Sequence, residues 1–215
     1  IAIEAHSCTL VEGNQIHDND KHGVYIAEEE GEGQSGALIV SDPAEVRSNH
    51  IYGNGQAGLF IKNCVEAEHN TIERNDYGIF IKEGQPDVRG NTVRHNAQTG
   101  VYLGGSDIVR DEDTGATVES NEISHNGITG ILIEEGADPI VSTNRVFSNG
   151  DVGVLVRNAK GLIRDNEVYD NALAGLQADS GSSPKVSGNT IRHNKQNGIN
   201  VLHSAGVYTA NDIYA

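Results

Sequence analysis

The sequence predicts an all-β chain wound as a right-handed, single-stranded parallel β-helix of about nine coils, with about 22 residues in each coil. Three observations predict it: a recurring pair of asparagines followed by a glycine, apolar residues that alternate with a period of two, and a scarcity of large core side chains. Of 215 residues, 26 are glycine and 5% are aromatic, with no Trp and no Met. The core must therefore consist of small and branched aliphatic residues.

The repeat places two asparagines five residues apart and a glycine after the second. The first asparagine recurs at Asn14, Asn49, Asn70, Asn91, Asn121, Asn144, Asn166, Asn189 and Asn211, and the second at Asn19, Asn54, Asn75, Asn96, Asn126, Asn149, Asn171 and Asn194. The glycine recurs at Gly23, Gly58, Gly78, Gly100, Gly130, Gly153, Gly175 and Gly198. Stacked amides can hydrogen-bond from coil to coil, and Asn and Gly tolerate the left-handed backbone of sharp corners. We assign these columns to structure rather than to chemistry.

Each coil is expected to contain three short strands. The first precedes the first asparagine and points residues such as Val46 and Val88 inward. The second lies between the two asparagines and points Ile51 and Ile72 inward, and the third follows the glycine, as in residues 79–81. Like residues of successive coils then stack about 4.8 Å apart.

The chain is predicted to be a single β-helix domain over residues 1–215 and a segment of a longer protein, with insertions at about 27–41 and 104–116 on one edge. Loops on one edge of a regular scaffold are where binding is usually built. The second insertion carries Asp107, Asp111 and Asp113, which faintly resemble a calcium loop but lack its ligand spacing and its closing Glu. We expect a solvated acidic loop and no cofactor, with calcium as the one metal to consider.

Thirty-one acidic against fifteen basic residues give a net charge of −16, which argues against nucleic acid or an anionic membrane as partner. No apolar run is long enough to span a membrane, and no signal peptide is recognised ahead of Ile1. Cys8 and Cys64 lie two coils apart, about 9.6 Å by strand spacing, which is beyond the reach of a disulfide. Unpaired thiols and the absence of an Asn-x-Ser/Thr sequon favour a reducing compartment.

The outward residue of the strand after the glycine is apolar in six consecutive coils: Tyr25, Phe60, Phe80, Tyr102, Leu132 and Leu155. This stripe is interpreted either as stacked surface side chains or as an exposed patch that marks an interface or a ligand groove. The second interpretation predicts a protein partner or a neutral or cationic glycan. It also allows self-association through the stripe.

A column of carboxylates, Glu45, Glu66 and Asp87, lies on the outer face of the first strands. The carboxylates are either neutralised by neighbouring arginines, or they form a cation site or a paired-carboxylate glycosidase centre. Lys62 and Lys82 follow the strands of the apolar stripe and supply positive charge.

The repeat resembles the parallel β-helix repeat family over nearly the whole chain, through its asparagine and glycine columns. That family includes pectate-lyase-like enzymes, alginate epimerases and the substrate-binding region of certain F-box ubiquitin ligase subunits. The resemblance implies the fold, while one scaffold hosts many different sites. Alginate epimerases of this fold carry an Asp-Pro-His-Asp signature, whereas here Asp42-Pro43 continues to Ala44-Glu45 and Asp138-Pro139 to Ile140-Val141. No catalytic residue is therefore carried over.

The leading hypothesis is a non-catalytic recognition module that binds along the stripe. The alternative is a polysaccharide-active enzyme, a lyase, epimerase or hydrolase, that uses Glu45, Glu66 or Asp87 with Lys62 or Lys82 as base. A third hypothesis is a pure spacer within a longer solenoid.

Overall fold

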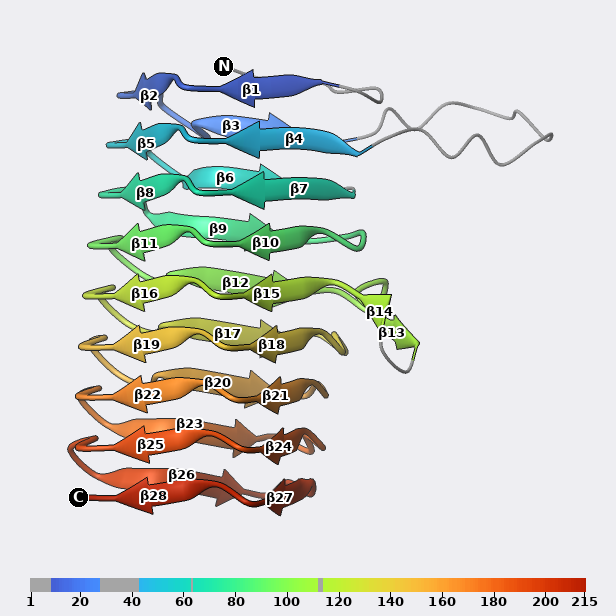
Figure 1. The fold of residues 1–215 in the computed structure, drawn as a ribbon, viewed down its shortest axis with the longest axis vertical. Coiled ribbons are helices and arrows are strands. Elements are labelled where there is room, and N and C mark those ends of the chain that lie inside the picture. Colours follow the sequence, from blue (N-terminus) through green and yellow to red (C-terminus); the bar gives the residue numbers. More distant parts are fainter. Residues whose placement is uncertain (1–8, 28–42, 63, 112–113) are drawn as a thin grey trace, which may run out of the picture.

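The computed structural model describes residues 9–27, 43–62, 64–111 and 114–215. These residues form a solenoid of short strands in which each coil lies directly beneath the one before it (Figure 1). No helix in these ranges is long and apolar enough to cross a membrane. The predicted fold class, an all-β parallel solenoid, is confirmed.

Three parallel sheets form the walls. In the described part of the chain, sheet A contains eight strands: β3 (Val24–Ile26), β6 (Ala57–Ile61), β9 (Tyr77–Ile81), β12 (Val101–Gly104), β17 (Ile131–Glu134), β20 (Val154–Arg157), β23 (Ala174–Asp179) and β26 (Asn197–Leu202). Sheet B contains nine: β1 (Leu10–Glu12), β4 (Ala44–Arg47), β7 (Val65–Glu68), β10 (Asp87–Arg89), β15 (Thr117–Glu119), β18 (Ile140–Ser142), β21 (Leu162–Arg164), β24 (Lys185–Ser187) and β27 (Val207–Thr209). Sheet C also contains nine: β2 (Gln15–His17), β5 (His50–Tyr52), β8 (Thr71–Glu73), β11 (Thr92–Arg94), β16 (Glu122–Ser124), β19 (Arg145–Phe147), β22 (Glu167–Tyr169), β25 (Thr190–Arg192) and β28 (Asp212–Tyr214).

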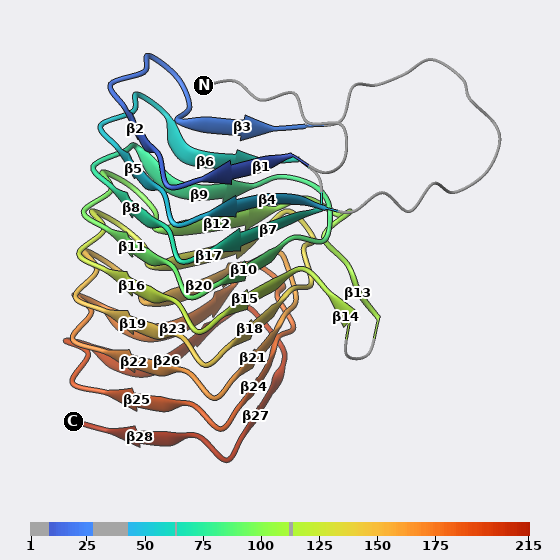
Figure 2. The same ribbon diagram turned by 45° about the horizontal axis from the view of Figure 1, so that its top comes forward.

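Successive coils pair in register, so that each sequence column becomes a spatial column. Val46 of β4 pairs with Ala67 of β7, which pairs with Val88 of β10. Sheets B and C match the nine coils expected from the repeat, while sheet A has one strand fewer among the described residues. The chain runs from sheet B to sheet C, then to sheet A, and from there to sheet B of the next coil (Figure 2).

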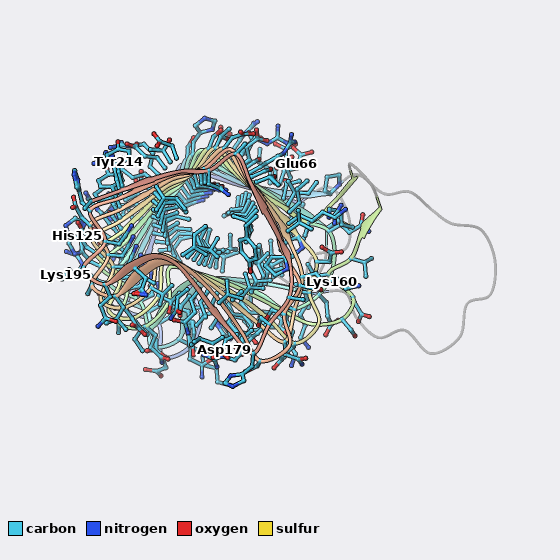
Figure 3. All side chains as sticks on the ribbon, turned by 90° about the horizontal axis from the view of Figure 1, so that it is seen from below. Glu66, His125, Lys160, Asp179, Lys195 and Tyr214 are labelled. Carbon is cyan, nitrogen blue, oxygen red and sulfur yellow. The ribbon has the colours of Figure 1, made fainter. Side chains whose placement is uncertain are left out.

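The core is a stack of aliphatic layers. Val46, Ile51, Leu59 and Ile61 of one coil are all fully buried, and equivalent residues of the following coils are buried as well until the last coils, where Val201 and Ile213 are exposed. Viewed along the axis, these side chains fill the interior, while the charged side chains of Glu66, Lys160 and Lys195 lie outside (Figure 3). The apolar positions predicted from the period of two are therefore the core positions.

The two asparagine columns occupy the corners on either side of sheet C and are buried ladders, as predicted. Within each ladder the amide oxygen of one asparagine accepts hydrogen bonds from the backbone N–H and the side-chain amide of the asparagine one coil earlier. Asn91 Oδ1, for example, lies 2.9 Å from the Asn70 backbone nitrogen and 3.0 Å from Asn70 Nδ2. Each ladder residue thereby satisfies a buried backbone donor as well as its own side chain.

Glycines such as Gly13, Gly53 and Gly90 take left-handed backbone as expected, but many other residues take it too. At both ladder corners the residue before the asparagine has positive φ, and in most coils it is neither Asn nor Gly: His69, Arg74, His95 and Ser120 have φ of 54°, 56°, 55° and 56°. Each such residue costs about 1 kcal/mol relative to right-handed backbone. The hydrogen bonds of the adjoining ladder offset this strain in each coil.

The repeat glycine is required by close packing rather than by its dihedral angles. A Cβ atom on Gly78 would lie 2.4 Å from the carbonyl oxygen of Gly100 and 2.4 Å from Val93 Cγ1. Successive coils therefore touch through their backbones at this corner, and any side chain would push them apart.

The second predicted insertion contains a short antiparallel hairpin, β13 (Arg110–Asp111) and β14 (Thr114–Gly115), that projects from the edge between sheets A and B (Figure 1). The first predicted insertion, 27–41, lies outside the described residues except for Ala27.

Candidate functional site

The predicted apolar stripe lies on the outer face of sheet A, where its aromatic members stack on one another. Tyr25, Phe60, Phe80 and Tyr102 are aligned in register on four successive strands. The ring centroids are 5.1 Å apart between Tyr25 and Phe60, 5.2 Å between Phe60 and Phe80, and 4.1 Å between Phe80 and Tyr102, with interplanar angles of 13°, 7° and 17°. Both faces of Phe60 and Phe80, and one face each of Tyr25 and Tyr102, are therefore covered by a neighbouring ring.

The stripe is less exposed than the sequence suggested. Tyr25, Phe60, Phe80 and Leu132 are half-buried, whereas Tyr102 and Leu155 are buried, with 8% and 6% of their surface exposed. The expectation of a continuous exposed stripe is thus wrong at these two positions.

Neighbouring residues explain both cases. The Tyr102 hydroxyl lies over Gly104, where a Cβ would be only 2.2 Å from that oxygen, and it donates a hydrogen bond to Glu134 Oε1 at 3.4 Å. Leu155 packs with Val152 and Leu173 in a small apolar cluster outside the main core.

A pocket of about 310 Å³ opens beside the stripe at its N-terminal end, which is within the size range of small-molecule sites. Its walls are His22, Gln56, Ala57, Phe60, Asp76, Tyr77 and Phe80. Three residues before Tyr25, Phe60 and Phe80 stand His22, Ala57 and Tyr77, which form a short column beside the stripe. The small Ala57 between two rings leaves the hollow, and Phe60 and Phe80 form its apolar side.

His22 enters the pocket as a neutral imidazole. The pKa of His22 is lowered below its ordinary value of 6.5, mainly by burial of the ring and to a smaller extent by the positive charge of Lys21. The backbone N–H of Ala57 donates to His22 Nδ1 at 3.3 Å, so this nitrogen carries no proton. The proton of the neutral ring is therefore on Nε2, which is a hydrogen-bond donor.

Asp76 and Tyr77 complete the polar rim. Gln98 Nε2 lies 2.8 Å from each carboxylate oxygen of Asp76 and holds that side chain in place. The pKa of the Tyr77 phenol is raised, mainly by burial and to a smaller extent by the negative charges of Asp76 and Glu134. Tyr77 therefore keeps its proton at neutral pH and can donate or accept a hydrogen bond.

These rim residues were not among the candidates drawn from the sequence. The available signal was the column His22, Ala57, Tyr77, in which one small residue separates two rings. This column predicts a pocket only when the register of the coils is known, because the register decides which residues of adjacent coils lie side by side.

The carboxylates Glu45, Glu66 and Asp87 do stack in one column of sheet B, as predicted. Arg47 Nη1 lies 3.1 Å from Glu45, and Arg89 forms an ion pair with Asp87, which also accepts a hydrogen bond from Thr117 Oγ1 at 2.7 Å. The interpretation as an ion-paired column therefore holds for the outer two members. Glu66 has no ion-pair partner within the described ranges.

Lys62 and Lys82 stand on the other side of the corner, at the ends of β6 and β9 in sheet A. Neither has an ion-pair partner in the described part of the chain. The structure does not bring an acid of this column and one of these lysines together as a catalytic pair. In the second insertion, the side chains of Asp111 and Asp113 lie outside what the structure describes. No group of three or more His, Cys, Asp or Glu side chains, Asp107 included, is arranged to hold a metal ion within the described residues.

Comparison with known proteins gives a family and a set of structural neighbours. The sequence pattern of the right-handed β-helix region matches residues 1–87 and 77–214. No curated protein matches the sequence.

Among solved structures, a mutant of the periplasmic alginate epimerase AlgG is similar, with a TM-score of 0.73 and 19% identity over 95% of this chain and 50% of that chain. The A-module of the Azotobacter vinelandii mannuronan C-5 epimerase AlgE4 is similar with a TM-score of 0.61 and 16% identity over 89% of this chain and 60% of that one. At these identities the likeness shows the fold alone. This chain spans about half the length of the AlgG structure.

Proposed function

Since this chain belongs to the right-handed β-helix region family, we propose that it is a polysaccharide-active protein that holds one sugar residue of a glycan in the pocket beside Phe60 and Phe80. The observation that carries the proposal is the pocket itself, with its apolar side and its rim of His22, Asp76 and Tyr77.

The pocket combines the two kinds of surface that a sugar offers. The aromatic edges and Ala57 suit the C–H groups of a sugar ring, and the rim suits its hydroxyl groups. Nε2–H of His22 is a donor and the Asp76 carboxylate is an acceptor, while the Tyr77 hydroxyl can be either. Because the rim contains a carboxylate and no arginine or lysine, it favours a neutral sugar over an anionic one at this position.

The structural neighbours support polysaccharide as the ligand class. Their names describe epimerases of alginate and mannuronan, and this favours a polysaccharide-active enzyme over the purely non-catalytic module that led the sequence analysis. The pocket also holds groups that can exchange a proton, since His22 is neutral and Tyr77 keeps its phenolic proton. A module that binds a glycan without converting it is the second candidate, because the hydrogen-bond donors and acceptors of the rim are sufficient to bind a sugar without any reaction. Protein binding and self-association through the stripe stay predictions.

The test is calorimetric titration with a panel of neutral oligosaccharides, together with analysis of each product by NMR. Replacing Tyr77→Ala removes one wall and one polar group, and we expect binding to weaken by about tenfold or more, equivalent to about 1.4 kcal/mol. Phe147→Ala is the matched control, because Phe147 stacks on Tyr169 at 4.9 Å on sheet C, away from the pocket.

The outcomes separate the candidates. Binding that depends on Tyr77 together with a changed sugar product identifies an enzyme. The same binding without conversion identifies a recognition module. Absence of binding across the panel, or equal loss in both variants, overturns the proposal.

A further inference from the structure

A second cluster of side chains lies on the outer face of sheet C, across the corner from the pocket. Its centre is Glu73 of β8, a carboxylate with only 7% of the residue exposed. Three basic side chains contact it: His50 Nε2 lies 3.1 Å from Oε1, Arg74 Nη2 lies 3.2 Å from Oε1, and Arg94 Nε lies 2.9 Å from Oε2. Arg74 and Arg94 therefore converge on one small area of the surface.

This cluster differs from the other arginine ion pairs of the described residues in its charge balance. Elsewhere acids equal or outnumber the arginines: Arg47 contacts Glu12 and Glu45, Arg89 contacts Glu68 and Asp87, Arg110 contacts Asp138, Arg157 contacts Glu134, and Arg145 and Arg192 share Glu122 and Glu167. Here Arg74 and Arg94 share Glu73 alone. One positive charge is left over, in a protein whose net charge is −16.

The two guanidinium groups keep donors for another ligand. Arg94 uses Nε to reach Glu73, and neither of its terminal nitrogens has a partner among the described residues. Arg74 uses Nη2, which leaves Nε and Nη1 without a partner in the same part of the chain. Their side chains are 60% and 44% exposed, for Arg74 and Arg94, so these donors are open to solvent.

The arginines are held in place before any ligand arrives. Arg74 lies over the Tyr52 ring, with its guanidinium carbon 5.2 Å from the ring centre, and Tyr52 stacks on His17 at 4.6 Å. Burial would raise the pKa of Glu73, but hydrogen bonds from His50 and Arg94 and the charges of the two arginines lower it below its ordinary value. Glu73 thus stays ionised at neutral pH and fixes both arginines, which reduces the entropy cost of binding.

We propose that Arg74 and Arg94 form a binding site for a tetrahedral oxyanion, a sulfate or phosphate group, on the outer face of sheet C. Arginine forks donate pairs of hydrogen bonds to such oxygens. Two forks from adjacent coils, with His50 beside them, surround a group that presents oxygens in several directions. A planar carboxylate, by contrast, can pair both of its oxygens with one arginine guanidinium group and does not require two. The site is separate from the pocket and does not depend on the proposed polysaccharide activity.

The experiment is an NMR titration of the arginine Nε–Hε resonances with inorganic sulfate and inorganic phosphate, at constant ionic strength against chloride. We expect saturable shifts at Arg74 and Arg94. Replacing Arg74→Gln removes a mostly exposed side chain, so the protein should stay folded, and binding should weaken by about tenfold or more because charge-assisted hydrogen bonds to the ligand are lost. The matched control is Arg164→Gln, which changes an exposed arginine of sheet B that has no ion-pair partner in the described ranges.

A second variant and a second set of ligands keep the result interpretable. Arg94→Lys keeps the charge but loses the fork, and we expect weaker binding with an unchanged melting temperature. A sulfated and a phosphorylated monosaccharide, compared at equal concentration, show which of the two sources the site prefers. Shifts that do not saturate, or that are the same in Arg74→Gln and the parent, indicate an adventitious ion only and overturn the proposal. Equal affinity for a carboxylated monosaccharide also overturns it.

Discussion

A buried asparagine ladder and an outer aromatic stack both run along this solenoid, and they differ in which substitutions they tolerate. The asparagine ladder from Asn49 to Asn189 lies inside a corner, with each residue 1–2% exposed and the same residue type in every coil. The aromatic stack from Tyr25 to Tyr102 lies outside sheet A, is mostly half-buried and occupies only four coils.

The difference teaches where this scaffold is free to vary. A buried amide must find a partner above and below, so any other residue leaves donors without acceptors in a dry interior. A ring on the outer face loses only contact area when it is replaced, because water can take its place. The sequence can therefore change on the outside, and there the pocket and the arginine cluster occur.

The strongest test of this comparison removes one rung of the ladder. In Asn91→Ala the backbone N–H and the side-chain amide of Asn70 both lose their acceptor. Two unsatisfied buried donors at about 1–3 kcal/mol each predict a loss of about 2–6 kcal/mol in the free energy of unfolding. Denaturant unfolding followed by circular dichroism measures it.

Asn14→Ala is the matched control at the first coil, where the side chain is exposed and, in the described part of the chain, no group donates to its amide oxygen. We expect it to cost less than about 1 kcal/mol. Equal losses in the two variants would show that burial of the ladder is not what makes asparagine necessary.

A smaller effect is expected from the aromatic stack. Phe80→Ala removes ring contacts on both sides, to Phe60 and to Tyr102. At about 0.5–1.5 kcal/mol for each aromatic pair, we expect a loss of about 1–3 kcal/mol. Tyr25→Ala, at the end of the stack with Phe60 as its single ring neighbour in the stack, should cost about half as much. A Phe80→Ala variant that unfolds as easily as Asn91→Ala would mean that the outer stack is as constrained as the inner ladder.

The smallest effect is expected from the surface ion pairs. Glu122→Gln removes the contact with Arg145, 3.0 Å apart and with both side chains at least 40% exposed. We expect a change of about 0–1 kcal/mol that shrinks further as salt is added. Thermal unfolding at low and high salt measures it, and a large salt-independent loss would contradict the view that the outer face tolerates change.

The sequence by itself determined the fold of this protein. The spacing of the asparagines, the glycine and the period-two aliphatic residues specified three strands per coil, the inward positions and the ladders. These features could be recognised because every coil has to bury aliphatic side chains, pair buried amides and pack closely against the next coil. It also placed Tyr25, Phe60 and Phe80 on one face, and Glu45, Glu66 and Asp87 in one column.

The tertiary structure alone decided which outward residues form sites. Tyr102 is buried because its hydroxyl folds over Gly104 toward Glu134, and the pocket exists because Ala57 falls between His22 and Tyr77 in neighbouring coils. Glu73 gathers His50, Arg74 and Arg94 from three coils. Each of these arrangements joins side chains about 20–35 residues apart that occur once rather than in every coil. A repeat reveals what all coils share, whereas a site depends on how the particular side chains of adjacent coils meet.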